Sequence, residues 1–340
     1  MTALLMVIIF LMLILPHELA HFIVARVSGM RVDRLSVGFG PKIWSIKRKG
    51  TEYALRLFPI GGYVNIAGMD RSKQEAGDGF YSKSVPRQLA VVIAGSVMNF
   101  VLAILLFAVV FMVGYQAVDL ERATVGGVIS GSPAEEAGLV AGDRIVSIDG
   151  RQIETWPQIS QYLDGSAEQV YELVVLRDTH EIAFAVTPRY YPEYDRKLVG
   201  ISPPTILVRY DPITAIGSGG KQVILVMGAI VDSLWRMVTG REGIDVTGPV
   251  GIAGYVSEAS QQGITSFLSL AALLSINLGL INLAPIPALD GGRVVFILVE
   301  AVRKKPVKIE FQGLIHYVGF VVLIGLLLFV TYRDIARLLP

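Results

Sequence analysis

The stretch Leu15-Pro16-His17-Glu18-Leu19-Ala20-His21-Phe22 lies inside an apolar run from Ala3 to Ala25. That run is long enough to cross a bilayer as one helix. A helix places His17 and His21 on one face, one turn apart, where both imidazoles can bind the same metal ion and Glu18 can handle protons on a nearby water. Ionisable side chains at membrane depth are costly and usually mark function, so we interpret the H-E-x-x-H pattern as a metal site. The alternative is a pair of buried, hydrogen-bonded histidines beside a paired glutamate.

The composition predicts a multi-pass membrane protein with a soluble part. Of the 340 residues, 53% are hydrophobic and 17% are charged, and the mean hydropathy is +0.57. A net charge of +1 gives no indication of nucleic-acid binding. The absence of cysteine excludes disulfides and thiolate metal sites. Because the first apolar run lacks a basic leader and a cleavage site, we expect it to be a retained helix.

Four apolar segments are expected to span the membrane, at about 3–25, 89–118, 266–288 and 313–331. A β region is expected at 32–66, between the first two spans. In it Thr51–Phe58 alternates between apolar and polar side chains, and Lys49-Gly50 forms the turn that joins it to Lys42–Arg48. In the second span, Gly95 and Asn99 are four residues apart, a spacing that permits close helix contact and an amide hydrogen bond between helices.

A soluble α+β domain is expected at 124–189, which is moderately charged and rich in turns. The pattern predicts helices at 132–138 and 156–163, a strand that ends at Asp149-Gly150, and strands at 171–176 and 181–186. The chain then divides into four parts: an N-terminal membrane half (1–118), this domain (119–190), a connector with an interfacial amphipathic helix at about 222–238 (191–262), and a C-terminal membrane half (263–340).

Basic loops predict the orientation, because Lys and Arg concentrate on the cytoplasmic side. Residues 26–87 hold twelve Lys and Arg against five acidic residues, and a basic patch follows at 303–308. Residues 119–221 hold nine Lys and Arg against fifteen acidic residues, so we expect them outside. Four spans with both termini outside satisfy these rules. A fifth span at 222–238 would move the basic patch outside, so that helix is expected along the membrane surface, with Asp232 on the outer side and excluded as a ligand.

A catalytic zinc ion is commonly held by three protein ligands, so His17 and His21 need a partner at similar depth. Asp290 follows a helix disrupted by prolines and precedes the basic patch, which places it on the cytoplasmic half with the histidines. Asp290 is therefore the preferred third ligand. Glu300 and His316 are the alternatives, although both stand closer to charged loop ends, where such side chains reach toward water.

The expected chemistry is hydrolysis. Zinc lowers the pKa of a water and polarises a carbonyl, and Glu18 would take the proton of that water and pass it to a leaving amine. Asn282, eight residues before Asp290, is a candidate hydrogen-bond donor to the developing oxyanion. An equally consistent role for Asn282 is to cap free backbone groups near Pro285.

Together these residues resemble the site-2 protease family of intramembrane zinc metalloproteases, and most closely its bacterial regulator-of-sigma-E protease group. The resemblance covers nearly the whole chain. It rests on His17-Glu18-Leu19-Ala20-His21; Gly38-Phe39-Gly40-Pro41; Pro59-Ile60-Gly61-Gly62-Tyr63-Val64; Phe80, Lys83 and Arg87 ahead of Ala94-Gly95 and Asn99-Phe100; Gly248-Pro249-Val250-Gly251-Ile252; and Asn282-x-x-Pro285-x-Pro287-x-Leu289-Asp290-Gly291.

The resemblance implies an intramembrane zinc endopeptidase with Zn²⁺ on His17, His21 and Asp290, with Glu18 catalytic and Asn282 assisting. It implies a bacterial cytoplasmic (inner) membrane protein whose PDZ-like domain lies outside and admits substrates already cut by an upstream site-1-type protease. It also implies that the strands of 32–66 dip into the membrane, where their edge pairs with an unwound substrate helix. Expected partners are the lipid bilayer and single-span membrane proteins, such as anti-sigma regulators and remnant signal peptides, and no nucleic acid.

The chain departs from the family pattern at two points. The best-known group members carry two tandem PDZ domains while this chain has room for one, and Ser96 stands where the family often has proline. Two other functions stay open. One is a membrane zinc enzyme whose third ligand is a glutamate. The other is a non-catalytic membrane scaffold that keeps a structural metal site and presents its PDZ-like domain to partners.

Overall fold

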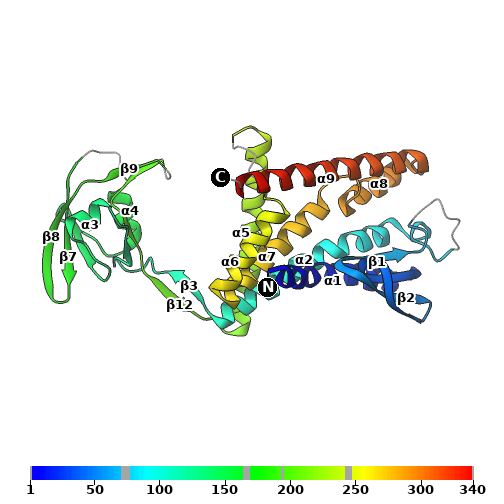
Figure 1. Ribbon diagram of the computed structural model, residues 1–340, viewed down its shortest axis with the longest axis horizontal. Helices are drawn as coiled ribbons and strands as arrows, with labels where there is room; N and C mark the ends of the chain where they lie inside the picture. The colour runs from blue at the N-terminus through cyan, green and yellow to red at the C-terminus, as the bar shows by residue number, and fades with distance from the viewer. Residues whose placement is uncertain (1, 70–76, 164–168, 193–194, 242–246, 339–340) are drawn as a thin grey trace. The chain divides into compact units, whose positions relative to one another are not determined.

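Two compact units make up the structure, a computed structural model that describes residues 2–69, 77–163, 169–192, 195–241 and 247–338 (Figure 1). Met1–Val113 and Tyr210–Pro340 together form the first, here called the membrane unit. Gly114–Arg209 form the second, here called the inserted unit. The chain therefore leaves the membrane unit once and returns to it.

Long apolar helices dominate the membrane unit. Its described helices are α1 (Thr2–Val27), α2 (Val85–Val113), α5 (Pro212–Val238), α6 (Pro249–Gln262), α7 (Ile264–Leu283), α8 (Asp290–Arg303) and α9 (Ile309–Leu338), with a short 3-10 helix η1 (Phe80–Ser82). Five of these described helices, α1, α2, α5, α7 and α9, are long and apolar enough to cross a membrane. The chain is thus a multi-pass helical membrane protein, with one more candidate span than the four predicted.

The extra candidate, α5, begins ten residues before the predicted start of its helix at 222. The Asp211 carboxylate caps it, accepting hydrogen bonds from the backbone N–H groups of Ile213 at 3.1 Å and Thr214 at 3.2 Å. Pro212 fills the first helical position, where its missing N–H is not needed. The sequence therefore carried a start signal at Asp211-Pro212 that the apolar pattern alone did not reveal.

Two other boundaries differ from the apolar pattern. Helix α2 ends at Val113 rather than near 118, because Gly114 has a φ of 113° and Tyr115–Val118 continues as strand β3. The connector holds a further helix, α6, where only a chain break is expected. Its N-terminus is held by Asp334 of α9, whose carboxylate accepts hydrogen bonds from the backbone N–H groups of Gly248 at 3.1 Å and Gly251 at 2.8 Å.

The predicted β region consists of β1 (Val32–Arg48) and β2 (Thr51–Ile66), joined by the Lys49-Gly50 turn as expected. The strands are longer than predicted and both bend. The first part of β1 therefore pairs on two sides: Leu35 lies opposite Tyr53 and also opposite Val64. The two strands thus pair as four segments in the order 42–48, 51–56, 32–37 and 62–66, with the first and last at the outer edges.

A charged cluster fastens these segments together. Glu52 accepts a hydrogen bond from Lys42 Nζ at 2.8 Å and another from Arg34 Nε at 2.8 Å. These two cations lower the pKa of Glu52 from 4.5 to about 2. Because Lys42 and Arg34 belong to the neighbouring segments on either side of Glu52, the cluster fixes the order of three of the four segments.

The inserted unit is a small α+β domain. A four-stranded antiparallel sheet runs in the order β6-β5-β7-β8, from β6 (Arg151–Gln152), β5 (Arg144–Ile148), β7 (Tyr171–Arg177) and β8 (His180–Val186). The unit also contains helices α3 (Pro133–Ala137) and α4 (Trp156–Tyr162). Three shorter antiparallel strand pairs complete it: β4 (Gly127–Val128) with β11 (Ile201–Ser202), β9 (Arg189–Tyr191) with β10 (Arg196–Leu198), and β3 with β12 (Thr205–Val208). The predicted helices and strands of this region are confirmed.

Candidate metal centre

Helix α1 presents both histidines of the opening motif to the interior of the membrane unit. His17 and His21 are buried, with exposed fractions of 6% and 8%, and their ring centroids are 4.7 Å apart. The helix continues through Pro16 without a break. The spacing of four residues therefore brings the imidazoles together, as a helix requires.

Asp290 reaches the same place from the other end of the chain. Helix α7 ends at Leu283, the loop 284–289 contains Pro285 and Pro287, and Asp290 begins α8. At Gly292, an added Cβ would lie 2.5 Å from the carbonyl oxygen of Ile286, so the first turn of α8 can fold back on the loop only without a side chain there. The glycine that follows Leu289-Asp290-Gly291 thus helps to hold the aspartate in position.

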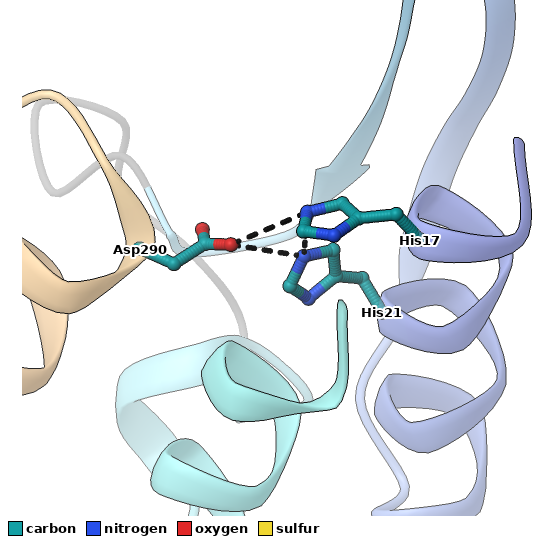
Figure 2. A group of neighbouring side chains, drawn as sticks. All are labelled: His17, His21 and Asp290. Atoms are coloured by element: carbon teal, nitrogen blue, oxygen red, sulfur yellow. Dashed lines mark hydrogen bonds and ion pairs between the residues drawn. The ribbon is translucent and has the colours of Figure 1, made fainter. Parts of the chain in front are cut away.

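The three side chains converge on one point (Figure 2). Oδ2 of Asp290 lies 3.4 Å from Nε2 of His17 and 3.2 Å from Nε2 of His21, and the two Nε2 atoms are 3.1 Å apart. Two imidazole nitrogens and one carboxylate oxygen are a donor set typical of catalytic zinc, which leaves a fourth position open. The residues present therefore fit a zinc ion.

Helix α2 packs against the cluster and contacts both histidines. The backbone carbonyl of Val91 accepts a hydrogen bond from Nδ1 of His21 at 2.7 Å, and the side-chain amide of Asn99 lies 3.2 Å from Nδ1 of His17. Between them, Gly95 faces the imidazoles so closely that an added Cβ would lie 2.6 Å from Nε2 of His17. The sequence marks Gly95 and Asn99 by their spacing as a helix-packing pair, but not as neighbours of the histidines.

A cavity of about 490 Å³ opens beside the cluster. It is lined by the two histidines and Asp290, and also by Glu18, Asn282, Arg293 and the segment 61–64 of β2. The Val64 backbone N–H is within hydrogen-bond reach of the Glu18 carboxylate. Asn282 lines the same cavity from the last turn of α7. Both residues expected to act on a substrate thus face the space where one would lie.

The alternative ligands lie elsewhere. Glu300 accepts hydrogen bonds from the backbone N–H of Val307 at 3.0 Å and from Nε2 of Gln312 at 2.9 Å, and so ties α8 to α9. Nδ1 of His316 accepts one from the backbone N–H of Ala288 at 3.0 Å, and so supports the loop before Asp290. Asp232 is paired with Arg236 at the surface of α5 at 2.6 Å. Among the described residues, only His17, His21 and Asp290 form a group that fits a metal ion.

Sequence reasoning did not single out Arg293. This half-buried residue lies one turn after Asp290 on α8 and lines the same cavity. Its i, i+3 spacing from Asp290 is the signal that would have placed both side chains on one face of a helix.

Comparison with known proteins identifies the family. Peptidase family M50 matches residues 5–326 of the chain. The zinc metalloprotease RasP of Bacillus licheniformis is 31% identical over an alignment 419 positions long, which covers 99% of each chain. The regulator of sigma-W protease RasP of Bacillus subtilis is 29% identical over an alignment of the same length, which again covers 99% of each chain.

Solved structures align with a smaller part of the chain. The PDZ domain of an SdrC-like protein from Listeria monocytogenes covers 26% of this chain and 92% of its own, with 18% identity and a TM-score of 0.23. The HtrA3 PDZ domain covers 28% of this chain and 90% of its own, with 17% identity and a TM-score of 0.16. The family match, in contrast, extends over both ends of the membrane unit and includes all three residues of the cluster. The chain therefore belongs to peptidase family M50 and is a membrane-embedded zinc metalloprotease of the site-2 protease type.

Proposed function

We propose that His17, His21 and Asp290 hold the catalytic zinc and that Glu18 carries the proton during peptide-bond hydrolysis. The observation that supports the ligand set is the convergence of three donor atoms within 3.4 Å of one another, from opposite ends of the chain. When bound there, zinc supplies a Lewis acid that activates water and polarises a carbonyl.

Glu18 and Asn282 divide the remaining work. The Glu18 carboxylate faces the cavity one residue from His17, where it takes a proton from the attacking water and returns it to the leaving amine. Asn282 faces the same cavity from the last turn of α7, and its amide donates a hydrogen bond to the oxyanion that develops on the substrate carbonyl. Glu18 thus acts on the water and the leaving nitrogen, and Asn282 acts on the carbonyl oxygen.

The substrate is a peptide segment in extended form. A transmembrane helix hides its carbonyls in its own hydrogen bonds, so it must unwind before attack. The outer segment 62–66 of β2 lies along the cavity. Its outer edge pairs with no other described strand, so it can accept an unwound chain. A Cβ added at Gly62 would lie at ordinary contact distance, 3.4 Å, from Cγ of Glu18, so this edge runs beside the side chain of Glu18. Single-span membrane proteins therefore fit, including anti-sigma regulators, as the name of the Bacillus subtilis relative suggests, and remnant signal peptides.

Helix packing supports a membrane arrangement with four spans. The first half of α1 (Ile9, Leu13) packs with residues of α6 and α7, and its end (Ala25) packs with Ile297 of α8. The α7–α8 segment therefore runs in the same direction as α1, and an odd number of crossings must lie between α1 and α7. Helix α2 is one crossing, and α7 is the next. Helix α5 then lies along the surface, and the chain spans four times.

The features of α5 agree with a surface position. Its buried residues Ala215, Gly219 and Val223 recur every four residues on one face, and its C-terminal half carries the exposed Asp232–Arg236 pair. Figure 1 shows α5 running across the direction of α2 and α9 rather than alongside them. With the basic residues of 26–87 and 303–308 in the cytoplasm, both termini and the inserted unit lie outside the bacterial inner membrane, and the zinc lies toward the cytoplasmic side.

The inserted unit is proposed to be a PDZ-like filter. It contains a cavity of about 610 Å³ along α4 and residues 198–203, a volume that suits a short peptide and is far too small for a folded domain. A substrate that keeps its bulky outer domain would be refused until an upstream protease has removed it.

The deciding experiment compares wild type with Glu18→Gln on a purified single-span substrate. The amide keeps the size of the side chain but cannot take a proton, so we expect full zinc content and a loss of cleavage of about 100-fold or more. Glu258→Gln, at an exposed position of α6, is the matched control and should cleave as wild type does. If Glu18→Gln cuts as fast as wild type, Glu18 is not the proton carrier and the proposed mechanism is wrong. If neither wild type nor variant cuts the substrate, a scaffold with a structural metal site becomes the better account.

A further inference from the structure

Asn99 is a polar residue buried deep in the membrane unit. Its exposed fraction is 0%, and it lies in the middle of α2. Its backbone is anchored to α7, because Oγ of Ser275 donates a hydrogen bond to the Asn99 carbonyl at 2.8 Å. A buried amide in a transmembrane helix is costly unless its hydrogen bonds are made, so the hydrogen-bond partners of Asn99 indicate its role.

The Asn99 side chain contacts His17, a proposed metal ligand. Nδ2 of Asn99 lies 3.2 Å from Nδ1 of His17, while Oδ1 is buried with no hydrogen-bond partner among the described residues. With the amide nitrogen facing it, Nδ1 of His17 would have to be the unprotonated nitrogen. The ring proton would then sit on Nε2, the atom that faces His21 and Asp290.

The neighbouring histidine shows the opposite arrangement. Nδ1 of His21 is 2.7 Å from the backbone carbonyl of Val91, which can only accept a hydrogen bond. His21 therefore carries its proton on Nδ1 and presents a lone pair at Nε2, the form that binds a metal. For His17 to bind the same ion through Nε2, its Nδ1 must also carry a proton and must donate it to an oxygen.

Asn99 can supply that oxygen. An amide oxygen and an amide nitrogen have nearly the same shape, and a half-turn of the side chain exchanges them without moving any neighbour. Asn99 is the hydrogen-bond partner that the described residues offer to Nδ1 of His17. The orphaned Oδ1 then gains the partner that it lacks.

We propose that Asn99 is a positioning residue of the metal site: its amide oxygen accepts the Nδ1 proton of His17 and so directs the Nε2 lone pair at zinc. This inference rests on the proposed role of His17 as a ligand. It gives the two histidines different supports, a backbone carbonyl for His21 and a side-chain amide for His17. Only the second can be changed by substitution.

The first test needs no variant. Nitrogen NMR of the zinc-loaded full chain in detergent, labelled with ¹⁵N-histidine and assigned by comparison with His17→Gln, reports which ring nitrogen of His17 carries the proton. We expect a protonated Nδ1 and a metal-bound Nε2. A His17 that is unprotonated at Nδ1 in the loaded protein would overturn the proposal.

The second test measures zinc affinity by competition with a chromogenic chelator. Asn99→Leu keeps the volume but cannot accept a hydrogen bond, so we expect affinity to fall about 10- to 100-fold. Asn99→Asp keeps an acceptor and should restore affinity to within about threefold of wild type. Ser96→Ala, one turn earlier and equally buried, is the matched control and should bind zinc as wild type does. Wild-type affinity in Asn99→Leu, or equal losses in the Leu and Asp variants, would contradict the proposal.

The same assay separates this inference from the proposed function. If His17→Gln binds zinc as tightly as wild type, the ligand set itself is wrong. If His17→Gln loses zinc while Asn99→Leu does not, the ligand set stands and only the role of Asn99 fails.

Discussion

The backbone of Gly95 lies directly against Nε2 of His21, so α2 has no room for a side chain where it passes the metal cluster. A Cβ at this position would overlap Nε2 of His21 and would also lie 2.6 Å from Nε2 of His17. The close approach of the two helices brings Val91 and Asn99 within hydrogen-bond distance of the imidazoles. Gly95 is therefore part of the construction of the site, although it has no side chain to contribute.

Gly95→Ala should accordingly damage the metal site. Overpacking a rigid contact costs about 1–3 kcal/mol, and here the strain falls on both ligand rings, so we expect zinc affinity to drop about tenfold or more. Chelator competition measures the drop. Gly254→Ala is the control, because it sits inside α6 with no atom within 4 Å of the added Cβ. Unchanged zinc affinity in Gly95→Ala would show that α2 can move away from α1 at no cost.

The third ligand can be tested against its competitors. Asp290→Ala should leave the purified protein with little zinc, because an ion held by two imidazoles alone is exposed to exchange. Glu300→Ala should keep its zinc, since Glu300 accepts hydrogen bonds from Val307 and Gln312 and lies outside the group that fits a metal ion. Metal content per chain, measured after identical purification, decides between them. A zinc-free Glu300→Ala beside a loaded Asp290→Ala would point to the glutamate instead.

The sequence was sufficient for the residues whose positions follow from local rules. His17 and His21 are related by helix periodicity, and Asp290 was placed by its depth relative to basic loops. What could not be predicted depends on contacts between distant elements. Neither the approach of Gly95 to His21 nor the double pairing of Leu35 is encoded in a local pattern. The hydrogen bonds from the backbone of Gly248 and Gly251 to Asp334, 83 to 86 residues away, are likewise not predictable from a local pattern.

The free edge of the sheet near the cavity is open to a cross-linking test, because the chain has no native cysteine. A cysteine at Tyr63, on the outer segment 62–66, should form a disulfide with a cysteine placed near the cleavage site of a substrate in the Glu18→Gln background. A cysteine at Trp44, on the opposite outer segment 42–48, is the control and should not. Equal cross-linking from both edges would argue against strand pairing at the active site.

The inserted unit should be removable without loss of the metal site. Strands β3 and β12 pair from Tyr115 with Val208 to Val118 with Thr205, so the chain leaves and returns as adjacent strands. Replacing 119–204 by a two-residue Asn-Gly turn should close this ladder as a hairpin. We expect zinc content to be unchanged and cleavage to extend to substrates that keep their outer domain. Loss of zinc in this variant would mean that the unit supports the site rather than filters substrates.

Acid should weaken the inserted unit through Asp143. Burial raises the pKa of this carboxyl, but hydrogen bonds from the Arg177 guanidinium and the Val140 N–H outweigh it, so the pKa lies below its usual 3.8. A group with a depressed folded pKa stabilises the fold fully above its unfolded pKa, and that contribution is lost as the pH falls through the folded value. The melting temperature should therefore fall from about pH 3.8 downward.

This prediction can be measured on the full chain. Trp156 lies in the inserted unit, and the other two tryptophans, Trp44 and Trp235, can be changed to Phe so that its fluorescence reports unfolding of that unit alone. Asp143→Asn should lower the melting temperature at pH 7 and flatten its dependence on acid. The same acid slope with Asn as with Asp would assign the effect to other carboxyls.

The position of Asp290 has a consequence during synthesis. The ribosome makes the H-E-x-x-H helix first, and Asp290 lies 269 positions after His21 in the sequence. Until Asp290 has been translated and inserted, the nascent polypeptide lacks one of its three proposed zinc ligands. A product that ends before Asp290 therefore cannot cut its neighbours, and activity becomes possible only after translation has passed residue 290 of 340.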